Sequence, residues 1–437
     1  MQPLRFSVLT CVSLLWSTGC GSDLVIAPGD GGGGEGGGST EAVTVTVSTG
    51  TGTPPEDIGE PSDVYPAPHP DPPTVVNVGG PVMDAPVIIP VYFQNDDPAL
   101  PAQVSDFIDK IGPTNYWMAT TSEYGVGPAS SLPAVQLVED APTLIDDAEV
   151  STWLAAKLNA DDPAFPAPGL NTLYAVYYPA GTTITMNDFD GGKSCESFGA
   201  YHSNTKLDAA HGGLLVPYAV MPRCGNWGGF SGVDALSIPS SHEFIEAATD
   251  PLPLTQPAHG QPDDAHYFWA FVLGGETGDL CAQEQTSYTT FPEDLEYAIQ
   301  RSWSNASALA GHDPCVPVIA GQTYFAAAPV LTDSVNLGGG IFSKGVKIKE
   351  GETKTIDVKL FSDGPTSAFN VQADDITYFL GAGGSLDLSF GIESGQNGQT
   401  LHLAITVNQE SDYGIEFFTV KARKGQQEHT WLGLVGN

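Results

Sequence analysis

Apolar and polar positions follow two different patterns along the chain, and the pattern changes near residue 317. Before this point, short continuous apolar runs alternate with segments whose apolar residues recur at helical spacing. The runs at 87–93, 173–178 and 214–220 are predicted as buried strands, and the segments 104–111 and 147–158 as helices. Strands interleaved with helices indicate an α+β (or α/β) fold around a mixed sheet.

Beyond residue 317 the helical spacing is absent and short alternating runs remain. They lie at 346–349, 353–360, 386–390, 401–407 and 415–424. This pattern is typical of a small antiparallel β-sandwich. Because the chain beyond residue 74 is longer than one hydrophobic core usually holds, we expect two domains, 75–317 and 318–437.

The N-terminal residues have the pattern of an export signal. Residues 1–19 combine a charged start at Arg5 with an apolar run that is too short to span a membrane. The small residues before Cys20 resemble a bacterial lipobox, which implies a lipidated Cys20 and a lipoprotein of the bacterial outer membrane or cell surface. Ser17 stands where a lipobox usually has leucine, so simple secretion is the alternative.

Residues 20–74 are predicted as a tether. They are rich in Gly, Ser, Thr, Pro and Glu, and they hold too little apolar surface to form a core. The Gly-rich run 31–38 indicates flexibility, and the Pro-rich stretch 66–73 indicates a stiffer end.

The charge of the chain excludes one class of partner. The sequence has 52 acidic against 15 basic residues, a formal net charge of -37. Such a charge repels nucleic acid and anionic membrane surfaces. The predicted partners are therefore an extracellular protein or a cell-surface polymer, with membrane contact through the lipid anchor only.

Four cysteines lie beyond the tether, namely Cys195, Cys224, Cys281 and Cys315. An even set in an exported chain indicates two disulfides, and a cysteine-rich zinc site is disfavoured because no two of the four have close CxxC spacing. Three pairings are open. We favour pairing between sequence neighbours, Cys195 with Cys224 and Cys281 with Cys315.

The segment with the most specific chemistry is Ser-His-Glu-Phe-Ile-Glu-Ala-Ala-Thr-Asp-Pro at 241–251. Ser240 or Ser241 can cap a helix just after Pro239, and the Thr-Asp-Pro end can stop it. The segment therefore predicts a short helix over 242–248.

Such a helix brings metal-ligating side chains together. His242 and Glu246 lie one turn apart, with Glu243 beside them as a general base. A second segment, Gly-Glu-Thr-Gly-Asp-Leu-Cys, places Glu276 or Asp279 on a tight turn as a third ligand, so the predicted cofactor is zinc. The alternative is a solvated helix face with a partly buried histidine, because a bare HExxE motif is weakly specific.

Several strings in this order resemble the exordium-like (phosphate-induced) proteins of plant cell walls and their secreted bacterial relatives. They lie at 79–82, 199–203, 218–222, 241–251, 275–281 and 301–305. The resemblance covers residues 79–316 and implies an extracellular zincin-like domain with an HExxE helix. It implies no substrate, because the family has no settled biochemical activity.

The predicted chemistry is conditional on the metal. Zinc held by His242, Glu246 and Glu276 leaves a position for water, whose pKa the metal lowers, and Glu243 takes the proton. His202 is the candidate that stabilises the oxyanion, and the alternative is a histidine that is hydrogen-bonded in a loop beside Cys195. A second carboxylate ligand makes the bound water less acidic than in a two-histidine site.

Two functions are therefore open. One is a surface-tethered or secreted zinc metallopeptidase-like protein that acts on extracellular protein. The other is a non-enzymatic cell-surface or cell-wall interaction protein with a structural metal site. An open coordination position in a cleft favours the first, and a closed, buried site favours the second.

The anchor at Cys20 gives the first testable prediction. Replacing Cys20 by serine should release the protein from membranes into the soluble fraction, because the tether has no other apolar anchor. Fractionation of cells that express the wild type and Cys20→Ser checks this. Unchanged partitioning of the variant contradicts the lipoprotein assignment.

Overall fold

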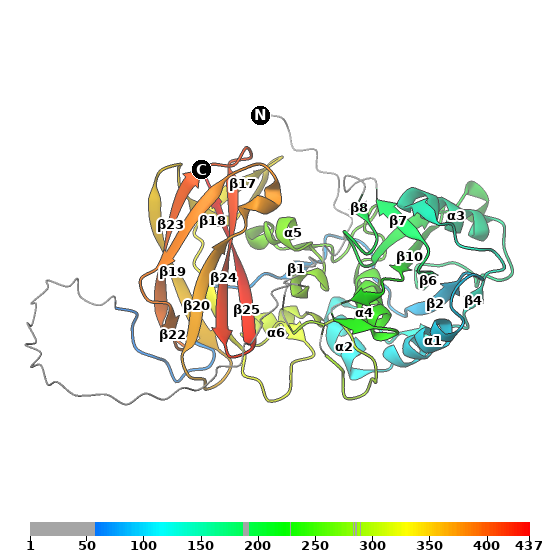
Figure 1. Ribbon diagram of the computed structural model, residues 1–437, viewed down its shortest axis with the longest axis horizontal. Helices are drawn as coiled ribbons and strands as arrows, with labels where there is room; N and C mark the ends of the chain where they lie inside the picture. Colours follow the sequence, from blue (N-terminus) through cyan, green and yellow to red (C-terminus); the bar gives the residue numbers. More distant parts are fainter. Residues whose placement is uncertain (1–56, 187–191, 228, 283, 285, 289) are drawn as a thin grey trace, which may run out of the picture. The chain divides into compact units, whose positions relative to one another are not determined.

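The computed structural model describes residues 57–186, 192–227, 229–282, 284, 286–288 and 290–437. The predicted signal segment, Cys20 and the tether as far as residue 56 lie outside the described residues. Residues 58–437 belong to one compact unit. Figure 1 shows a region of sheet and helices followed along the chain by a region of long strands.

A six-stranded mixed sheet forms the centre of the first region. It comprises β2 (Val87–Tyr92), β3 (Ser130–Ser131), β4 (Val135–Gln136), β6 (Thr172–Tyr178), β9 (Tyr201–Lys206) and β10 (Leu215–Pro222). The order is β3-β2-β6-β10-β9, with β4 also paired to β2. Only β9 is antiparallel to its neighbour in this sheet. The three apolar runs predicted as strands are β2, β6 and β10.

Helices cover both faces of this sheet. They are α1 (Ala99–Ile111), α2 (Asn115–Thr121), α3 (Asp147–Asn159) and α4 (Asp234–Thr249). Along β6, Leu173 and Tyr177 pack with α1, α2 and α4, whereas Tyr174 and Tyr178 pack with α3. Burial of both faces explains why the strand sequences are continuously apolar. The two helices predicted from spacing are α1 and α3.

Short elements complete the first region. The sheets are β5 (Leu144–Asp146) with β7 (Thr183–Met186) and β8 (Gly192–Lys193), β1 (Val75–Val76) with β13 (Gln261–Pro262), β11 (Asn226–Trp227) with β12 (Phe230–Ser231), and β14 (Ser302–Trp303) with β15 (Cys315–Val316). The helical elements are η1 (Ser122–Tyr124), η3 (Ala209–His211), η4 (Asp264–His266), α5 (Trp269–Val272), η5 (Asp279–Cys281) and α6 (Asn305–Leu309).

The helix that carries the HExxE motif is longer than the predicted range 242–248. α4 begins at Asp234 and ends at Thr249, so the predicted stop is right and the predicted start is wrong. Pro239 lies inside the helix, where it removes a backbone hydrogen bond. Every residue from Ala235 onward in α4 is buried, so tertiary packing outweighs that loss.

Ser240 and Ser241 are not the caps of α4. The hydroxyl of Ser240 lies 2.8 Å from the Tyr177 hydroxyl on β6. The hydroxyl of Ser241 donates to the Ile238 carbonyl (2.7 Å) and accepts from the backbone N–H of Gln300 (3.0 Å). Both serines thus tie a fully buried helix to its neighbours.

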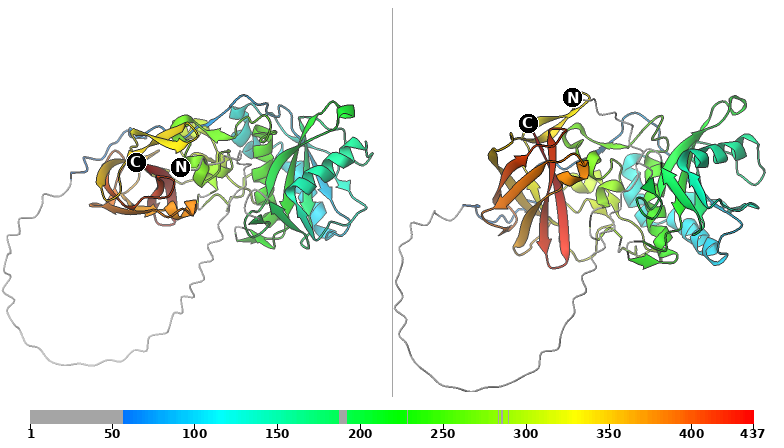
Figure 2. Two further views of the ribbon diagram at one scale, coloured as in Figure 1. Left: turned by 90° about the horizontal axis from the view of Figure 1, so that it is seen from above. Right: turned by 45° about the horizontal axis from the view of Figure 1, so that its top comes forward.

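The second region is a β-sandwich (Figure 2). One sheet is β16 (Phe325–Pro329), β19 (Thr353–Ser362), β23 (Thr400–Gln409) and β21 (Ser385–Phe390), and the other is β17 (Asp333–Gly338), β18 (Ile341–Lys347), β25 (Gln427–Gly436), β24 (Ile415–Lys424), β20 (Phe369–Asp375) and β22 (Ser394–Gly395), with η6 (Thr377–Leu380) after β20. Val358 and Leu403 from the first sheet share a core with Phe418 and Val420 from the second. The predicted β-sandwich is confirmed.

An apolar cluster joins the two regions. Trp269 and Trp303 from the first region lie in one core with Phe417 and Trp431 from the second. The Trp269 and Trp431 rings meet edge to face, with centroids 6.2 Å apart. The two predicted domains therefore share part of their hydrophobic core.

The described end of the predicted tether packs against both regions. The His69 ring stacks on Phe361 of β19, with centroids 3.9 Å apart. Thr74 donates its backbone N–H and its hydroxyl to the Asp263 carboxylate. Residues 57–74 thus form a strap held by specific contacts, although their Pro-rich composition predicts a tether.

The predicted fold class, an α+β (or α/β) zincin-like domain, is wrong. The protein is mostly β, with 35% strand against 20% helix. Ten sandwich strands contribute much of this excess. Two- and three-residue strands such as β1, β5 and β13 add to it, and such short strands have no hydrophobic period by which a sequence can reveal them.

Both predicted disulfides are present. Cys195 pairs with Cys224, and Cys281 pairs with Cys315. The pairing is therefore the one between sequence neighbours. Two disulfides indicate an extracellular or otherwise oxidising compartment. No helix in the described part of the chain has the length and apolar character needed to cross a membrane.

The disulfide between Cys281 and Cys315 holds the end of η5, so its removal should lower the stability of the protein. Replacing both Cys281 and Cys315 by serine should lower the free energy of unfolding by roughly 2–5 kcal/mol, because the unfolded chain gains freedom. Denaturant unfolding without reductant checks this. A double variant as stable as the wild type contradicts it.

A buried ion pair between the regions predicts a pH effect. His429 on β25 lies 3.1 Å from Glu284. Burial opposes the charge on the ring, but the hydrogen bond and the charge of Glu284 outweigh it and raise the pKa of His429. A raised pKa in the folded protein stabilises it below the unfolded pKa of about 6.5, and the effect is lost as pH rises through the folded pKa.

The wild type should therefore exceed His429→Gln in thermal stability by a larger margin at about pH 5.5 than at about pH 9. Scanning calorimetry of both proteins at the two pH values measures the margin. The same margin at both pH values contradicts a protonated His429 in the folded protein.

Candidate metal centre

Helix α4 carries three of the predicted site residues on its buried surface. His242 Nε2 lies 2.9 Å from Glu246 Oε2, one turn further along the helix. Glu243 Oε1 lies 4.0 Å from the same nitrogen. All three side chains are buried, with at most 1% of the residue surface exposed. The predicted alternative of a solvated helix face therefore does not hold.

The turn at 276–279 faces this part of α4. Glu246 Oε1 accepts the backbone N–H groups of Gly278 and Asp279, both at 3.0 Å. A Cβ at position 278 would lie 2.6 Å from His242 Nδ1, so the close approach requires glycine. Asp279 Oδ1 lies 3.7 Å from His242 Nε2. The turn thus positions a carboxylate against the helix.

His202 joins the cluster from strand β9, not from a loop. Its Nδ1 lies 3.2 Å from Glu243 Oε2, and its Nε2 lies 3.6 Å from Glu276 Oε1. The residue is fully buried. His202 therefore lies between the predicted general base and one of the predicted third ligands.

In the part of the chain that the structure describes, two sets of three side chains could each hold a metal ion. One set is His242, Glu246 and Asp279, and the other is His202, Glu246 and Glu276. Within each set the potential ligand atoms lie within 4.8 Å of one another. The structure thus separates the two predicted third ligands, since Asp279 belongs with His242 and Glu276 with His202.

The protonation of the cluster follows from burial and mutual charge. Burial opposes the charge on His242, but the charge of Glu246 and their hydrogen bond raise its pKa to about 10. Burial acts against Glu246 ionisation too, and His242 outweighs it and lowers the pKa of Glu246. Burial raises the pKa of Glu243 despite its hydrogen bond to His202. In the metal-free protein, His242 and Glu246 thus form the ionised pair.

Asp250 also belongs to the cluster, although the sequence predicts it only as part of the end of the helix. Its Oδ1 accepts the backbone N–H of Ala258 at 2.8 Å. Its carboxyl lies beside that of Glu276, and burial raises its pKa. The signal was available, because His242, Glu246 and Asp250 follow one another at one-turn spacing.

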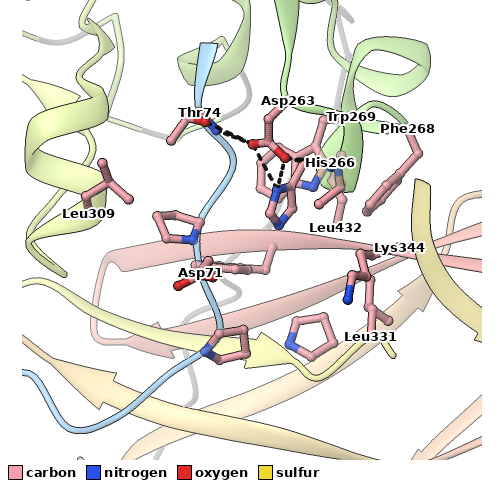
Figure 3. A pocket seen from close by; sticks show the side chains of 15 residues that line it. Asp71, Thr74, Asp263, His266, Phe268, Trp269, Leu309, Leu331, Lys344 and Leu432 are labelled. Carbon is pink, nitrogen blue, oxygen red and sulfur yellow. Dashed lines mark hydrogen bonds and ion pairs between the residues drawn. The ribbon is translucent and has the colours of Figure 1, made fainter. Parts of the chain in front are cut away.

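A separate cavity of about 440 Å³ lies beneath the strap (Figure 3). Trp269, which the sequence places near the second carboxylate segment, lines this cavity and not the metal-ligand cluster. Asp263 holds His266 there through Nδ1 at 2.9 Å. The cavity contains none of the candidate ligands.

Comparisons with known proteins leave the family open. The chain matches no protein-family model and no curated protein. Among solved structures, a titin M3 domain matches 21% of this chain and 85% of its own, with 9% identity and a TM-score of 0.15. A chimeric titin Z1Z2 carrying an exogenous KLER peptide from decorin matches 26% of this chain and 95% of its own, with 16% identity and a TM-score of 0.15.

Proposed function

We propose that this protein is an exported, non-enzymatic interaction protein whose buried metal centre stabilises its structure. The observation that carries the proposal is the burial of the candidate ligands. His242, Glu246 and Asp279 each expose no more than 1% of their surface. Structural zinc sites are closed by their protein ligands, whereas catalytic sites keep a position open to water and substrate.

The donor set fits a divalent ion such as zinc. It offers one imidazole nitrogen and two carboxylates, all of which are common zinc ligands. Zinc would supply positive charge where buried carboxylates otherwise face one another, and it would compete with a proton for His242. Glu246 is already oriented for this role by the two backbone N–H groups of the turn.

The centre is well placed to stabilise more than the helix. The backbone N–H of Trp303 donates to the Thr277 carbonyl at 2.7 Å, within the turn that supplies Asp279. Leu280 and Cys281, which follow Asp279, belong to the cluster shared with the sandwich. A metal that fixes this turn would therefore support the apolar contact between the two regions.

The proposed setting is the cell surface. The disulfides support export, and the lipobox-like segment supports an anchor at Cys20 with the residues before the strap as a tether. The resemblance to exordium-like proteins favours a cell-wall or extracellular role. We propose an extracellular protein or a cell-surface polymer as the partner.

A second candidate function is metal-dependent peptide hydrolysis, and the position of Glu243 favours it. Glu243 belongs to neither ligand set but contacts both histidines, at 3.2 Å and 4.0 Å. Zinc, when bound, would acidify a water molecule. Glu243 could then hold the proton, since burial raises its pKa toward the range of a general base.

The first experiment tests the structural centre. Wild-type protein purified without chelator should contain zinc, and Glu246→Gln should lose it and unfold at a lower temperature, because metal binding contributes directly to folding. Elemental analysis and calorimetry measure both effects. Glu352→Gln is the matched control, because Glu352 is exposed in the sandwich and should change neither value.

Glu243→Gln separates the two candidate functions. Under the structural proposal neither the wild type nor this variant cleaves a broad peptide library. Cleavage by the wild type that is lost in metal-loaded Glu243→Gln would establish the hydrolytic function instead. Wild-type protein that contains no stoichiometric metal contradicts both candidate functions.

A further inference from the structure

We infer that the same buried cluster binds a second divalent cation, ligated by His202 and Glu276, with Glu246 shared between the two sites. This inference rests on the proposed metal centre and extends it from one ion to a pair. His202, Glu246 and Glu276 form their own set of closely spaced ligand atoms. All three are buried, with at most 1% of their surface exposed.

The charge of the cluster favours two ions over one. Five carboxyl groups meet in this buried cluster, those of Glu243, Glu246, Asp250, Glu276 and Asp279. Only two imidazoles contact them in the described ion pairs, those of His202 and His242. A histidine that ligates a metal is neutral, so one bound ion removes a positive charge as it adds two. Two divalent ions carry enough charge to offset four carboxylates, whereas one ion offsets two.

The orientation of His202 suits a metal ligand. Its Nδ1 contacts Glu243 Oε2 at 3.2 Å. An ionised Glu243 accepts a hydrogen bond from Nδ1, and the neutral ring that a metal requires then offers a lone pair at Nε2. That nitrogen is buried and makes no hydrogen bond. A metal-ligating histidine usually donates the N–H of its other ring nitrogen to a carboxylate.

The surroundings of the His202 Nε2 atom are rich in carboxyl oxygens. Glu276 Oε1 lies 3.6 Å away, so this nitrogen faces a carboxyl oxygen. Asp250 brings a second carboxyl beside Glu276. These atoms repel one another unless a proton or a cation lies between them. One nitrogen among several carboxylate oxygens suits zinc or manganese.

Glu246 links the two sites. Glu246 belongs to both sets of closely spaced ligand atoms, and its Oε2 lies 2.9 Å from His242 Nε2 and 3.8 Å from Nδ1 of the His202 ring. Its Oε1 is held by the turn. Shared carboxylates are typical of paired metal ions. The first ion joins helix α4 to the turn at 276–279. The second ion would tie strand β9 to both of them.

The test is the number of metal ions per chain. Full-length protein purified without chelator should contain two zinc ions by elemental analysis, and His202→Gln should retain one. His211→Gln is a matched control, because His211 pairs with Asp161 and Asp208 outside the cluster and should leave two ions bound. His242→Gln should also retain one, and Glu246→Gln should retain none.

The outcomes separate this inference from the proposed function. No metal in the wild type overturns both. One ion in the wild type that persists in His202→Gln but is lost in His242→Gln supports the proposed centre and overturns the second site. If His202→Gln fails to fold, the wild type reconstituted with Mn²⁺ decides. Exchange coupling between adjacent ions in its electron paramagnetic resonance spectrum supports the pair, and the spectrum of an isolated ion overturns it.

Discussion

Burying a group of carboxylates is the constraint on which this structure depends. Glu243, Glu246, Asp250, Glu276 and Asp279 each expose no more than 1% of their surface. Charges removed from water in this way cost several kcal/mol each unless opposite charge and hydrogen bonds offset the loss. The cluster offsets part of this cost with two histidines and two backbone N–H groups, and the remaining buried charge is the basis of the proposed metal centre.

The same constraint explains features that seem unrelated in the sequence. Gly278 is required because any side chain would collide with His242, and Gln300 then fixes the turn by donating to the Gly278 carbonyl at 2.8 Å. The disulfide at Cys281 holds the next residues, which pack against the sandwich. The buried cluster and the contact between the two regions are therefore consecutive along one short stretch of chain.

The sequence predicted what depends on local periodicity. Apolar runs located β2, β6 and β10, helical spacing located α1 and α3, and neighbouring cysteines located both disulfides. It failed where tertiary packing overrides a local signal. Pro239 suggests a helix boundary, but α4 continues through it because the whole helix is enclosed. The fold class was missed because the ten sandwich strands, together with two- and three-residue strands that have no period, outweigh the helices.

The candidate site shows the same division between local and tertiary information. The spacing of His242 and Glu246 follows from helix geometry alone, and so the pair could be anticipated. The sequence could not predict that Glu276 faces His202 and Asp279 faces His242, because these contacts depend on how β9 and the turn approach α4.

An HExxE motif defines which side chains share one face of a helix. Whether they can catalyse hydrolysis depends on the residues that pack against that face. In this protein β9 covers it with His202, whose contact with Glu243 occupies the carboxylate that hydrolysis would need as a base. A carboxylate that orients a ligating histidine is held by that contact, whereas one that accepts a proton from water must be able to reach the water molecule. The enclosure of Glu243 therefore favours a structural role for the centre.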